Sequence, residues 1–282
     1  MRLESSPSSC CRWLHTCIYT VIIAQPPQVI IPLYLQPDES ETLAVAAKTA
    51  MNASIPLHPY YPSDAILPGY VANTFSAREL QAIFAAGATA ILALTYHLIK
   101  KTRPNLPNGE VATALWFTLS AFIHFFFEGY FAYNQANMPA TVHIFGQLWK
   151  EYSLSDSRYL TRDSFIVCME TITAVFWGPL SFACAYCVVA AHPLRHPLQL
   201  IVSLGQLYGD VLYFATCSFD KLAAGIAHCR PEDFYFWCYY VFCNAFWIVI
   251  PLYLIVRSCG ETKRAFEKAA ELEGRSERKK KI

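Results

Sequence analysis

Five long apolar stretches, separated by short polar segments, dominate the chain after residue 79. They run over residues 80–99, 111–133, 164–191, 197–217 and 234–256. An α-helix rises about 1.5 Å per residue, so roughly 20 apolar residues are enough to cross a bilayer. Each stretch reaches about that length with few charged side chains. The pattern predicts an all-α integral membrane bundle of five transmembrane helices.

The first seventy residues lack this pattern. An apolar run over residues 17–35 is interrupted by the sequence QPPQ at 25–28, and four prolines follow between residues 56 and 68. Prolines at this density predict an extended, turn-rich segment. We therefore expect an irregular N-terminal extension over residues 1–70, a five-helix transmembrane domain over 71–258 and a charged tail over 259–282.

Composition agrees with a membrane protein. The chain is 55% hydrophobic and 15% charged, whereas soluble domains carry roughly 25% charged residues. Its eleven cysteines fall mostly inside apolar stretches, where thiols behave as small hydrophobes. The one CxxC spacing, Cys184 to Cys187, lies within a membrane span. We expect no disulfide framework, no metal site and no cofactor.

Lysine and arginine are distributed unevenly between the connecting segments. The first and third connections and the tail carry Lys100, Lys101, Arg103, Arg195 and Arg257. Cytosolic loops are enriched in these residues, so we expect a lumenal N-terminus and a cytosolic C-terminus. The last four residues, KKKI, are similar to a dilysine retrieval signal, which favours the endoplasmic reticulum membrane. A solvated basic end is the other interpretation.

The third stretch contains a carboxyl group. Glu170 lies in its first half, and the span has no Lys or Arg to neutralise it. A carboxylate at the bilayer centre costs about 2.5–3.5 kcal/mol, so Glu170 must face protein or water. Thr173 and Trp177 follow on the same helical face. A polar contact between helices is the alternative to a functional site.

The second stretch carries the strongest chemical signal. Within LWFTLSAFIHFFFEGYF, His124 and Glu128 stand at i and i+4 and share a face. A single intramembrane histidine is usually a hydrogen-bonding contact between helices. A histidine and a glutamate one turn apart are more typical of a coupled acid–base pair.

The fourth and fifth stretches also present polar faces. A narrow arc of the fourth contains Gln199, Ser203, Gln206, Asp210, Tyr213 and Cys217. One face of the fifth contains Trp237, Tyr240, Asn244, Trp247 and Pro251. These stripes could seal the bundle by hydrogen bonds or contact a ligand. A bundle that brings four such faces together would enclose an apolar cavity with a few ionisable groups.

The chemistry of such a cavity excludes several classes of function. No basic cluster would hold a phosphate, and no Gly-rich loop or Ser-His-Asp order is present. Aromatic rings suit a flat apolar molecule or a cation over a ring face. Acid, base and π faces without a nucleophile favour proton transfer to and from carbon, so we expect isomerisation of a lipid.

Three long blocks carry a resemblance to a known family. The blocks are LWKEYSLSDSRYLTRDSFIVCMETITAVFWGPLSF, HPLRHPLQLIVSLGQLYGDVLYF and FYFWCYYVFCNAFW, and FIHFFFEGYF fits the second-helix motif. Over residues 80–257 the chain resembles the emopamil-binding protein family, the 3-β-hydroxysteroid Δ8,Δ7-isomerases of sterol biosynthesis. The first seventy residues lie outside the resemblance.

The resemblance implies a five-helix enzyme of the endoplasmic reticulum that moves a sterol double bond from C8–C9 to C7–C8. A proton is delivered to C9, a carbocation forms at C8, and a proton leaves C7. It also implies that cationic amphiphilic amines bind as inhibitors. The expected catalytic residues are His124, Glu128 and Glu170. The expected substrate-binding residues are Thr173, Trp177, Asp210, Tyr213, Asn244 and Trp247.

Physical chemistry agrees with these implied roles. An alkene is a very weak base, so the proton donor must be a neutral acid in a dry site. A tertiary carbocation cannot form hydrogen bonds, so a carboxylate and the Trp247 face must stabilise it. The sequence leaves the direction of transfer open. We assign proton delivery to Glu170 with His124, and proton removal to Glu128.

Two other functions compete with the isomerase. One is a non-catalytic membrane protein of the same family that binds sterols or amphiphilic amines. The other is a transporter, which five spans without inverted repeats do not favour. The partners we expect are a sterol substrate, membrane lipid and amine inhibitors, with no nucleic acid. The oligomeric state stays open, a homodimer being one alternative.

Overall fold

The computed structural model describes residues 58–280, which form helices and no strands. Five helical segments in this part of the chain are long and apolar enough to cross a membrane. Their bounds are Ala77–Thr102, Asn108–Ala140, Ser164–Ala190, Arg195–Ala224 and Tyr235–Ser276. The prediction of a five-helix membrane bundle is confirmed, and the protein is a multi-pass membrane protein.

Each span consists of one or more helical elements. The first is α3 (Ala77–Thr102) and the fourth is α9 (Arg195–Ala224). The second contains α4 (Asn108–Phe122), η1 (Ile123–Glu128), α5 (Gly129–Asn134) and η2 (Gln135–Ala140). The third contains α7 (Ser164–Ile172), η4 (Thr173–Trp177) and α8 (Gly178–Ala190). The fifth contains η5 (Tyr235–Phe242) and α10 (Cys243–Lys280).

Local sequence signals explain where several of these helices begin and end. Ser76 and Glu79 form a capping box at the start of α3, which satisfies amide groups that have no partner in the helix. Asp163 accepts a hydrogen bond from the Ile166 amide and caps α7. Gly225, with φ of +68°, ends α9 in a left-handed conformation that glycine adopts without strain.

Three of the five spans contain a π-helical segment. These are η1 and η4, which lie inside the second and third spans, and η5, which begins the fifth span. In η4 the sequence offers a reason, because Pro179 has no amide hydrogen to donate to the carbonyl of Val175. The irregularity of the helix just before Gly178 and Pro179 is therefore a change of hydrogen-bond register. Such π-turns occur frequently at functional sites.

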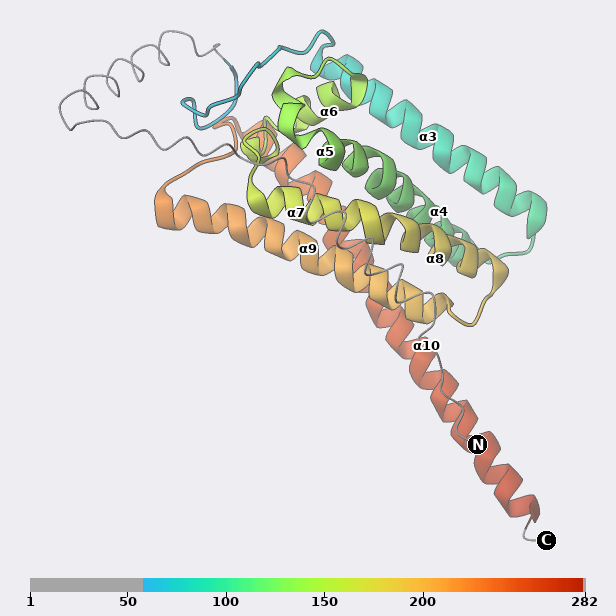
Figure 1. Cartoon of the computed structure of the whole chain (residues 1–282). Coiled ribbons are helices and arrows are strands. Elements are labelled where there is room, and N and C mark those ends of the chain that lie inside the picture. Colours follow the sequence, from blue (N-terminus) through green and yellow to red (C-terminus); the bar gives the residue numbers. More distant parts are fainter. Residues whose placement is uncertain (1–57, 281–282) are drawn as a thin grey trace, which may run out of the picture. The chain divides into compact units, whose positions relative to one another are not determined.

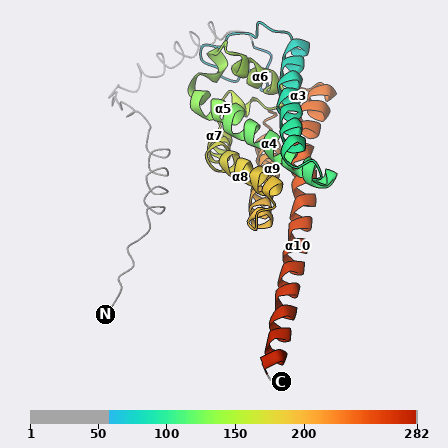
Figure 2. The ribbon, with the colours of Figure 1, turned by 90° about the vertical axis from the view of Figure 1, so that its right-hand side faces the viewer.

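The spans pack in pairs. α4 lies along α8, α9 lies along α10, and α3 contacts α4 and α6 (Figure 1). Gly178 allows the third span to pack closely against the second. A Cβ at this position would lie 3.0 Å from the backbone nitrogen of Phe125 in η1. α10 continues past the other helices as one long helix (Figure 2). Its side chains after residue 262 are exposed wherever they are described.

Residues 58–76 and 141–163 form a layer over one end of the bundle, which we call the closing layer. It contains α6 (Ile144–Tyr152) and η3 (Ser157–Tyr159). The Lys150 ammonium donates to the Val71 carbonyl at 2.6 Å and joins the two segments. Tyr60 and Leu67, which lie in the extension expected over residues 1–70, are buried in the same core cluster as Trp149.

The opposite end of the bundle carries a charged cluster. Glu110 of α4 forms ion pairs with Arg195 of α9 and with Arg257 of α10. Arg103, just after α3, donates to the Val189 carbonyl of α8 at 2.8 Å. The apolar run predicted at residues 17–35 and the last two residues of the KKKI sequence lie outside the described residues.

Candidate active site

A cavity of about 800 Å³ lies within the bundle at the level of the π-helical segments. All five spans and the closing layer contribute to its wall. The wall includes every residue that the sequence predicted as catalytic or substrate-binding: His124, Glu128, Glu170, Thr173, Trp177, Asp210, Tyr213, Asn244 and Trp247. The cavity has the size of ordinary small-molecule sites.

His124 and Glu128 form a buried pair on η1. The Nδ1 atom of His124 lies 2.8 Å from Oε2 of Glu128. Its other nitrogen, Nε2, lies 3.1 Å from the amide nitrogen of Gln206 on α9. An amide nitrogen can only donate, so Nε2 of the neutral imidazole accepts and the proton resides on Nδ1. His124 therefore donates to Glu128.

Aromatic rings cover this pair. The Trp247 ring from α10 lies 4.7 Å from the His124 ring, measured between centroids. Trp116 from α4 lies 5.0 Å from Trp247 in the same way. A π face in this position can stabilise positive charge on a ligand beside the histidine.

Glu170 is the second buried carboxyl group. Its Oε1 atom accepts a hydrogen bond of 2.9 Å from the Tyr159 hydroxyl of the closing layer. It lies close enough to Glu128 and His124 to interact with both electrostatically. Thr173, one turn later, donates its hydroxyl to the Met169 carbonyl. Within residues 58–280, no lysine or arginine forms an ion pair with either glutamate.

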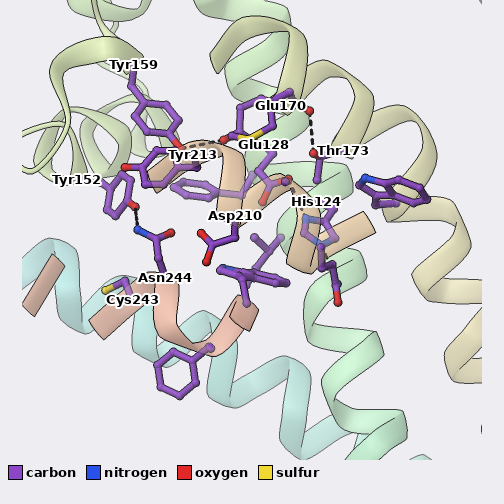
Figure 3. Close-up of a pocket in the computed structure, with 18 of the residues that line it drawn as sticks. His124, Glu128, Tyr152, Tyr159, Glu170, Thr173, Asp210, Tyr213, Cys243 and Asn244 are labelled. Atoms are coloured by element: carbon purple, nitrogen blue, oxygen red, sulfur yellow. Dashed lines mark hydrogen bonds and ion pairs between the residues drawn. The ribbon is translucent and has the colours of Figure 1, made fainter. Parts of the chain in front are cut away.

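The other side of the cavity is polar and less completely hydrogen-bonded. The Asn244 amide donates to the Tyr152 hydroxyl at 2.8 Å and to the Tyr240 carbonyl at 2.7 Å. Oδ2 of Asp210 and the hydroxyl oxygen of Tyr213 have no hydrogen-bond partner among the described residues. Figure 3 shows these side chains from α9 and α10 around the cavity, with the His124–Glu128 pair on its other side.

The closing layer holds Tyr159 rigidly against Glu170. The Tyr159 ring stacks on Trp149 at 4.7 Å, and Trp149 stacks on Phe127 of η1 at 4.5 Å. Next to Tyr159, Arg158 forms a buried, multiply hydrogen-bonded ion pair with Asp156. Burial raises the pKa of Tyr159 well above its usual range, so its hydroxyl stays protonated and remains a donor.

Tyr159 and Gln206 were missed as site residues. Gln206 lies on the polar stripe that the sequence revealed in the fourth span, so its helical phase was a usable signal. Tyr159 ends the short helix η3, outside the periodic apolar stretches, and the fold of the closing layer brings it to Glu170. No group of three or more His, Cys, Asp or Glu side chains in the described part of the chain is arranged to hold a metal ion.

The cavity reaches the outer surface of the bundle. Phe84 of α3 and Phe246 of α10 line it and are also exposed, as are Ile172 of α7 and Tyr208 of α9. These surfaces belong to membrane-spanning helices, so an apolar ligand can enter from the lipid. Two carboxyl groups and an imidazole in an apolar enclosure can move protons to and from a bound hydrocarbon.

Comparison with known proteins gives a consistent match. Residues 144–258 match the model of the EXPERA family (EXPanded EBP superfamily). A mouse protein named 3-beta-hydroxysteroid-Delta(8),Delta(7)-isomerase is 40% identical over 205 residues, which cover 72% of this chain and 87% of the relative. The guinea pig protein of the same name is 39% identical over 204 residues, with the same coverage of 72% and 87%. A rice protein named "Probable 3-beta-hydroxysteroid-Delta(8),Delta(7)-isomerase" is 32% identical over 213 residues, 74% of this chain and 94% of the relative.

Proposed function

Because this chain belongs to the family of 3-β-hydroxysteroid-Δ8,Δ7-isomerases, we propose that it moves a sterol double bond from C8–C9 to C7–C8. One observation carries the proposal: a His–Glu pair and a second glutamate, neither glutamate paired with a lysine or arginine of residues 58–280, line an apolar cavity that reaches the outer surface of the bundle. The reaction adds one proton at C9 and removes one at C7. It therefore needs no oxidant, reductant or co-substrate.

Glu170 and His124 deliver the proton in this proposal. The Tyr159 hydroxyl donates a hydrogen bond to Oε1 of Glu170 and fixes the orientation of the carboxyl group. In this proposal the other oxygen, Oε2, holds the proton that protonates C9. Transfer to an alkene requires an acid that is neutral and shielded from water, and a buried carboxyl group without a cation meets that requirement.

Glu128 removes the proton from C7. It accepts the Nδ1 proton of His124, which is the arrangement expected of a carboxylate that acts as a base. The close pair of Glu128 and His124 can then return the proton to Glu170, with which both interact. The net result is an isomerisation that leaves the protein unchanged.

The carbocation at C8 is stabilised by charge and by π faces. The Trp247 ring lies beside the His124 ring and lines the cavity. A cation over such a ring gains about 0.5–2 kcal/mol per contact. Cationic amphiphilic amines resemble this intermediate in charge and shape, so they are expected to compete with the sterol for the same cavity.

We place the protein in the endoplasmic reticulum membrane with a lumenal N-terminus and a cytosolic C-terminus. The charged end of the bundle, which holds Arg103, Arg195 and Arg257, supports this orientation because cytosolic ends are rich in arginine and lysine. The closing layer would then face the lumen. The KKKI sequence at the C-terminus supports retention in this compartment.

A direct assay tests the activity. Microsomes from a host without its own sterol isomerase, expressing this protein, are incubated with a Δ8 sterol, and the position of the double bond is read by gas chromatography and mass spectrometry. Conversion to the Δ7 sterol, blocked by a cationic amphiphilic amine, is expected. Saturable sterol binding without conversion would identify a non-catalytic binding protein and reject the isomerase.

A further inference from the structure

Two polar atoms on the cavity wall remain without partners, and the proposed chemistry does not use them. Asp210 is 8% exposed and Tyr213 is 2% exposed. Within residues 58–280, Oδ2 of Asp210 and the hydroxyl oxygen of Tyr213 make no hydrogen bond of normal geometry. The Tyr213 hydroxyl lies near that of Tyr152. Buried polar groups are almost always hydrogen-bonded, and leaving one unpaired is costly. Their position on the cavity wall suggests that a bound ligand supplies the partner.

The two side chains are placed to act together. They lie three residues apart on α9, so they are neighbours on one helical face. Both line the cavity, and Figure 3 shows the Asp210 carboxyl group pointing into it. A carboxyl oxygen accepts hydrogen bonds and a phenol donates one, so together they match a ligand hydroxyl, which donates once and also accepts.

Other polar groups on the wall are less suitable. Both amide hydrogens of Asn244 are used by Tyr152 and Tyr240, and the Thr173 hydroxyl donates to the helix backbone. Two further unpartnered atoms on the wall are Oε1 of Gln206 and Nε1 of Trp116. These residues contact His124 and Trp247, so they lie beside the proton-transfer groups.

The spacing along α9 fits a sterol. Asp210 follows Gln206 by four residues, which is about 6 Å along the helix axis. Gln206 contacts His124, so a group at Asp210 lies roughly the length of two fused six-membered rings from the proposed site of proton transfer. The relatives act on 3-β-hydroxysteroids according to their names, and the 3-hydroxyl lies about that far from C8 and C9.

We propose that Asp210 and Tyr213 bind the 3β-hydroxyl group of the sterol. The hydroxyl donates to the Asp210 carboxyl group and accepts from the Tyr213 phenol. This contact selects 3-hydroxysterols and fixes ring A, which positions the C8–C9 bond beside the acid and base. The inference rests on the proposed isomerase function and adds to it the residues that determine specificity.

The experiment compares two substrates that differ only at C3. Purified full-length protein is assayed with a 3β-hydroxy Δ8 sterol and with its 3-deoxy analogue. The variants are Asp210→Leu, which removes the acceptor, and Tyr213→Phe, which removes a single oxygen atom. Ser203→Ala is the matched control, because Ser203 is a buried, unpartnered residue of α9 that does not line the cavity. Equilibrium binding of both sterols is measured in parallel.

The wild-type protein is expected to prefer the hydroxysterol by about tenfold or more in kcat/KM, the usual scale for a hydrogen-bonded hydroxyl. Asp210→Leu should reduce this preference to within about twofold, and Tyr213→Phe should reduce it in part. The lower kcat/KM of the variants with the hydroxysterol should result from a higher KM. The variants should lose less kcat/KM with the 3-deoxy analogue, which has no hydroxyl group to bind, than with the hydroxysterol, and Ser203→Ala should keep the full preference.

Two results would overturn the inference. An unchanged preference in the variants would mean that the hydroxyl lies elsewhere, and equal losses of kcat on both substrates would mean that the residues serve catalysis or folding. If Asp210→Leu fails to accumulate, Tyr213→Phe decides the question. A wild-type protein without turnover, but with hydroxyl-dependent binding that the variants lose, would reject the isomerase and keep this contact.

Discussion

The proton chemistry depends on how His124 is held between two neighbours. Gln206 fixes its tautomer from one side and Glu128 accepts its proton on the other. Since the imidazole and the carboxyl group are in direct contact, they titrate as a coupled unit rather than as two independent groups. Changing either one therefore changes the proton affinity of the other.

The first prediction concerns Glu128→Gln. The amide keeps the size of the side chain and can still accept from His124, so the fold should be retained. Turnover of a Δ8 sterol should fall by roughly 10²-fold or more, the usual scale for a positioned acid–base group. The measurement is the Δ7 product per mole of folded protein, together with deuterium incorporation at C9 from heavy water.

The double variant His124→Ala with Glu128→Gln tests whether the pair acts as a unit. It should lose little more activity than the worse single variant, because groups that act together are not additive. Ser120→Ala is the control, since Ser120 is buried on α4 one turn before His124 and does not line the cavity. Normal turnover by folded Glu128→Gln protein would leave Glu128 a structural residue only.

A second prediction concerns Glu151 of the closing layer. Burial raises the pKa of its carboxyl group, and the Tyr239 hydrogen bond and the Arg230 charge only partly oppose this effect. A raised pKa in the folded state means that the folded protein holds the proton more tightly than the unfolded chain. The contribution of protonated Glu151 to the free energy of unfolding is therefore fully present below the unfolded-state pKa of this carboxyl group. It is lost as the pH rises through the folded-state pKa.

Glu151→Gln should therefore gain melting temperature relative to wild type as the pH rises from about 4 toward neutrality. The isosteric amide still accepts from the Tyr239 hydroxyl, which lies 2.8 Å from Oε1 of Glu151. The measurement is thermal unfolding in detergent across this pH range, with Glu267→Gln on the exposed part of α10 as the control. Parallel wild-type and Glu151→Gln profiles would contradict the prediction.

Whether the sequence could predict a site residue depended on the structural element that contains it. The membrane spans contain His124, Glu128, Glu170 and Asp210. A polar residue is costly inside a membrane and therefore indicates a specific role, and the helical phase shows which face it occupies. Tyr159 ends the short helix η3 outside the membrane spans, and its partner Glu170 lies on α7, eleven residues later. Its position depends on the tertiary packing of the closing layer, which local periodicity does not encode.

At the scale of elements, the π-helical segments were also beyond the reach of sequence periodicity. A regular α-helical phase placed the predicted site residues of each span on one face. It did not indicate that three spans adopt π-helical hydrogen bonding beside the cavity. Each π-turn inserts extra backbone and re-aims the side chains that follow. The first, fourth and fifth helices extend past the ends predicted for their spans, because their last turns carry charged residues outside the apolar stretch.

The contact between Trp177 and α9 gives a third prediction. A Cβ on Gly205 would lie 2.5 Å from Cζ2 of Trp177, so Gly205→Ala should displace that ring from the cavity wall. We expect weaker sterol binding, by at least about threefold. Gly209→Ala is the matched control one turn away, where a Cβ meets no atom within 4 Å. Ligand titrations of both variants test this, and equal affinities would contradict it.

The closing layer depends on a buried ion pair, which gives a fourth prediction. The side chains of Arg158 and Asp156 are 1% and 0% exposed, and Arg158 also donates to Thr216 of α9 at 2.7 Å. Arg158→Ala would leave the Asp156 charge buried and unpaired, which costs about 3–5 kcal/mol. A large loss of melting temperature is expected. It should exceed the loss for Arg230→Ala, whose partner Glu232 is exposed.

A comparison of these two arginine variants also tests how the layer is attached. If both lower the melting temperature equally, the layer is held by the rest of its contacts and the buried pair is not essential. If Arg158→Ala alone destabilises the protein and also weakens sterol binding, the pair supports Tyr159 at the cavity. Wild-type behaviour of Arg158→Ala would contradict the prediction.

At the scale of the molecule, the two ends of the bundle differ in chemistry. One end carries the closing layer over the cavity, and the other carries the ion pairs of Glu110 and a long helix of alternating charge. Because residues of the closing layer line the cavity, we expect a sterol to enter from the leaflet on that side. The orientation of the protein therefore decides which leaflet supplies the substrate.

The final prediction is that the closing layer faces the lumen. The connection between α3 and α4 and the tail after Arg257 carry the excess of lysine and arginine, so both should be cytosolic. A glycosylation acceptor inserted at the exposed residues 225–227, in the connection after α9, should be modified in microsomes. The same acceptor inserted at residues 104–105 should not be, and a C-terminal epitope should be digested by protease in sealed vesicles. Modification at 104–105, or protection of the epitope, would reverse the orientation and assign substrate entry to the cytosolic leaflet.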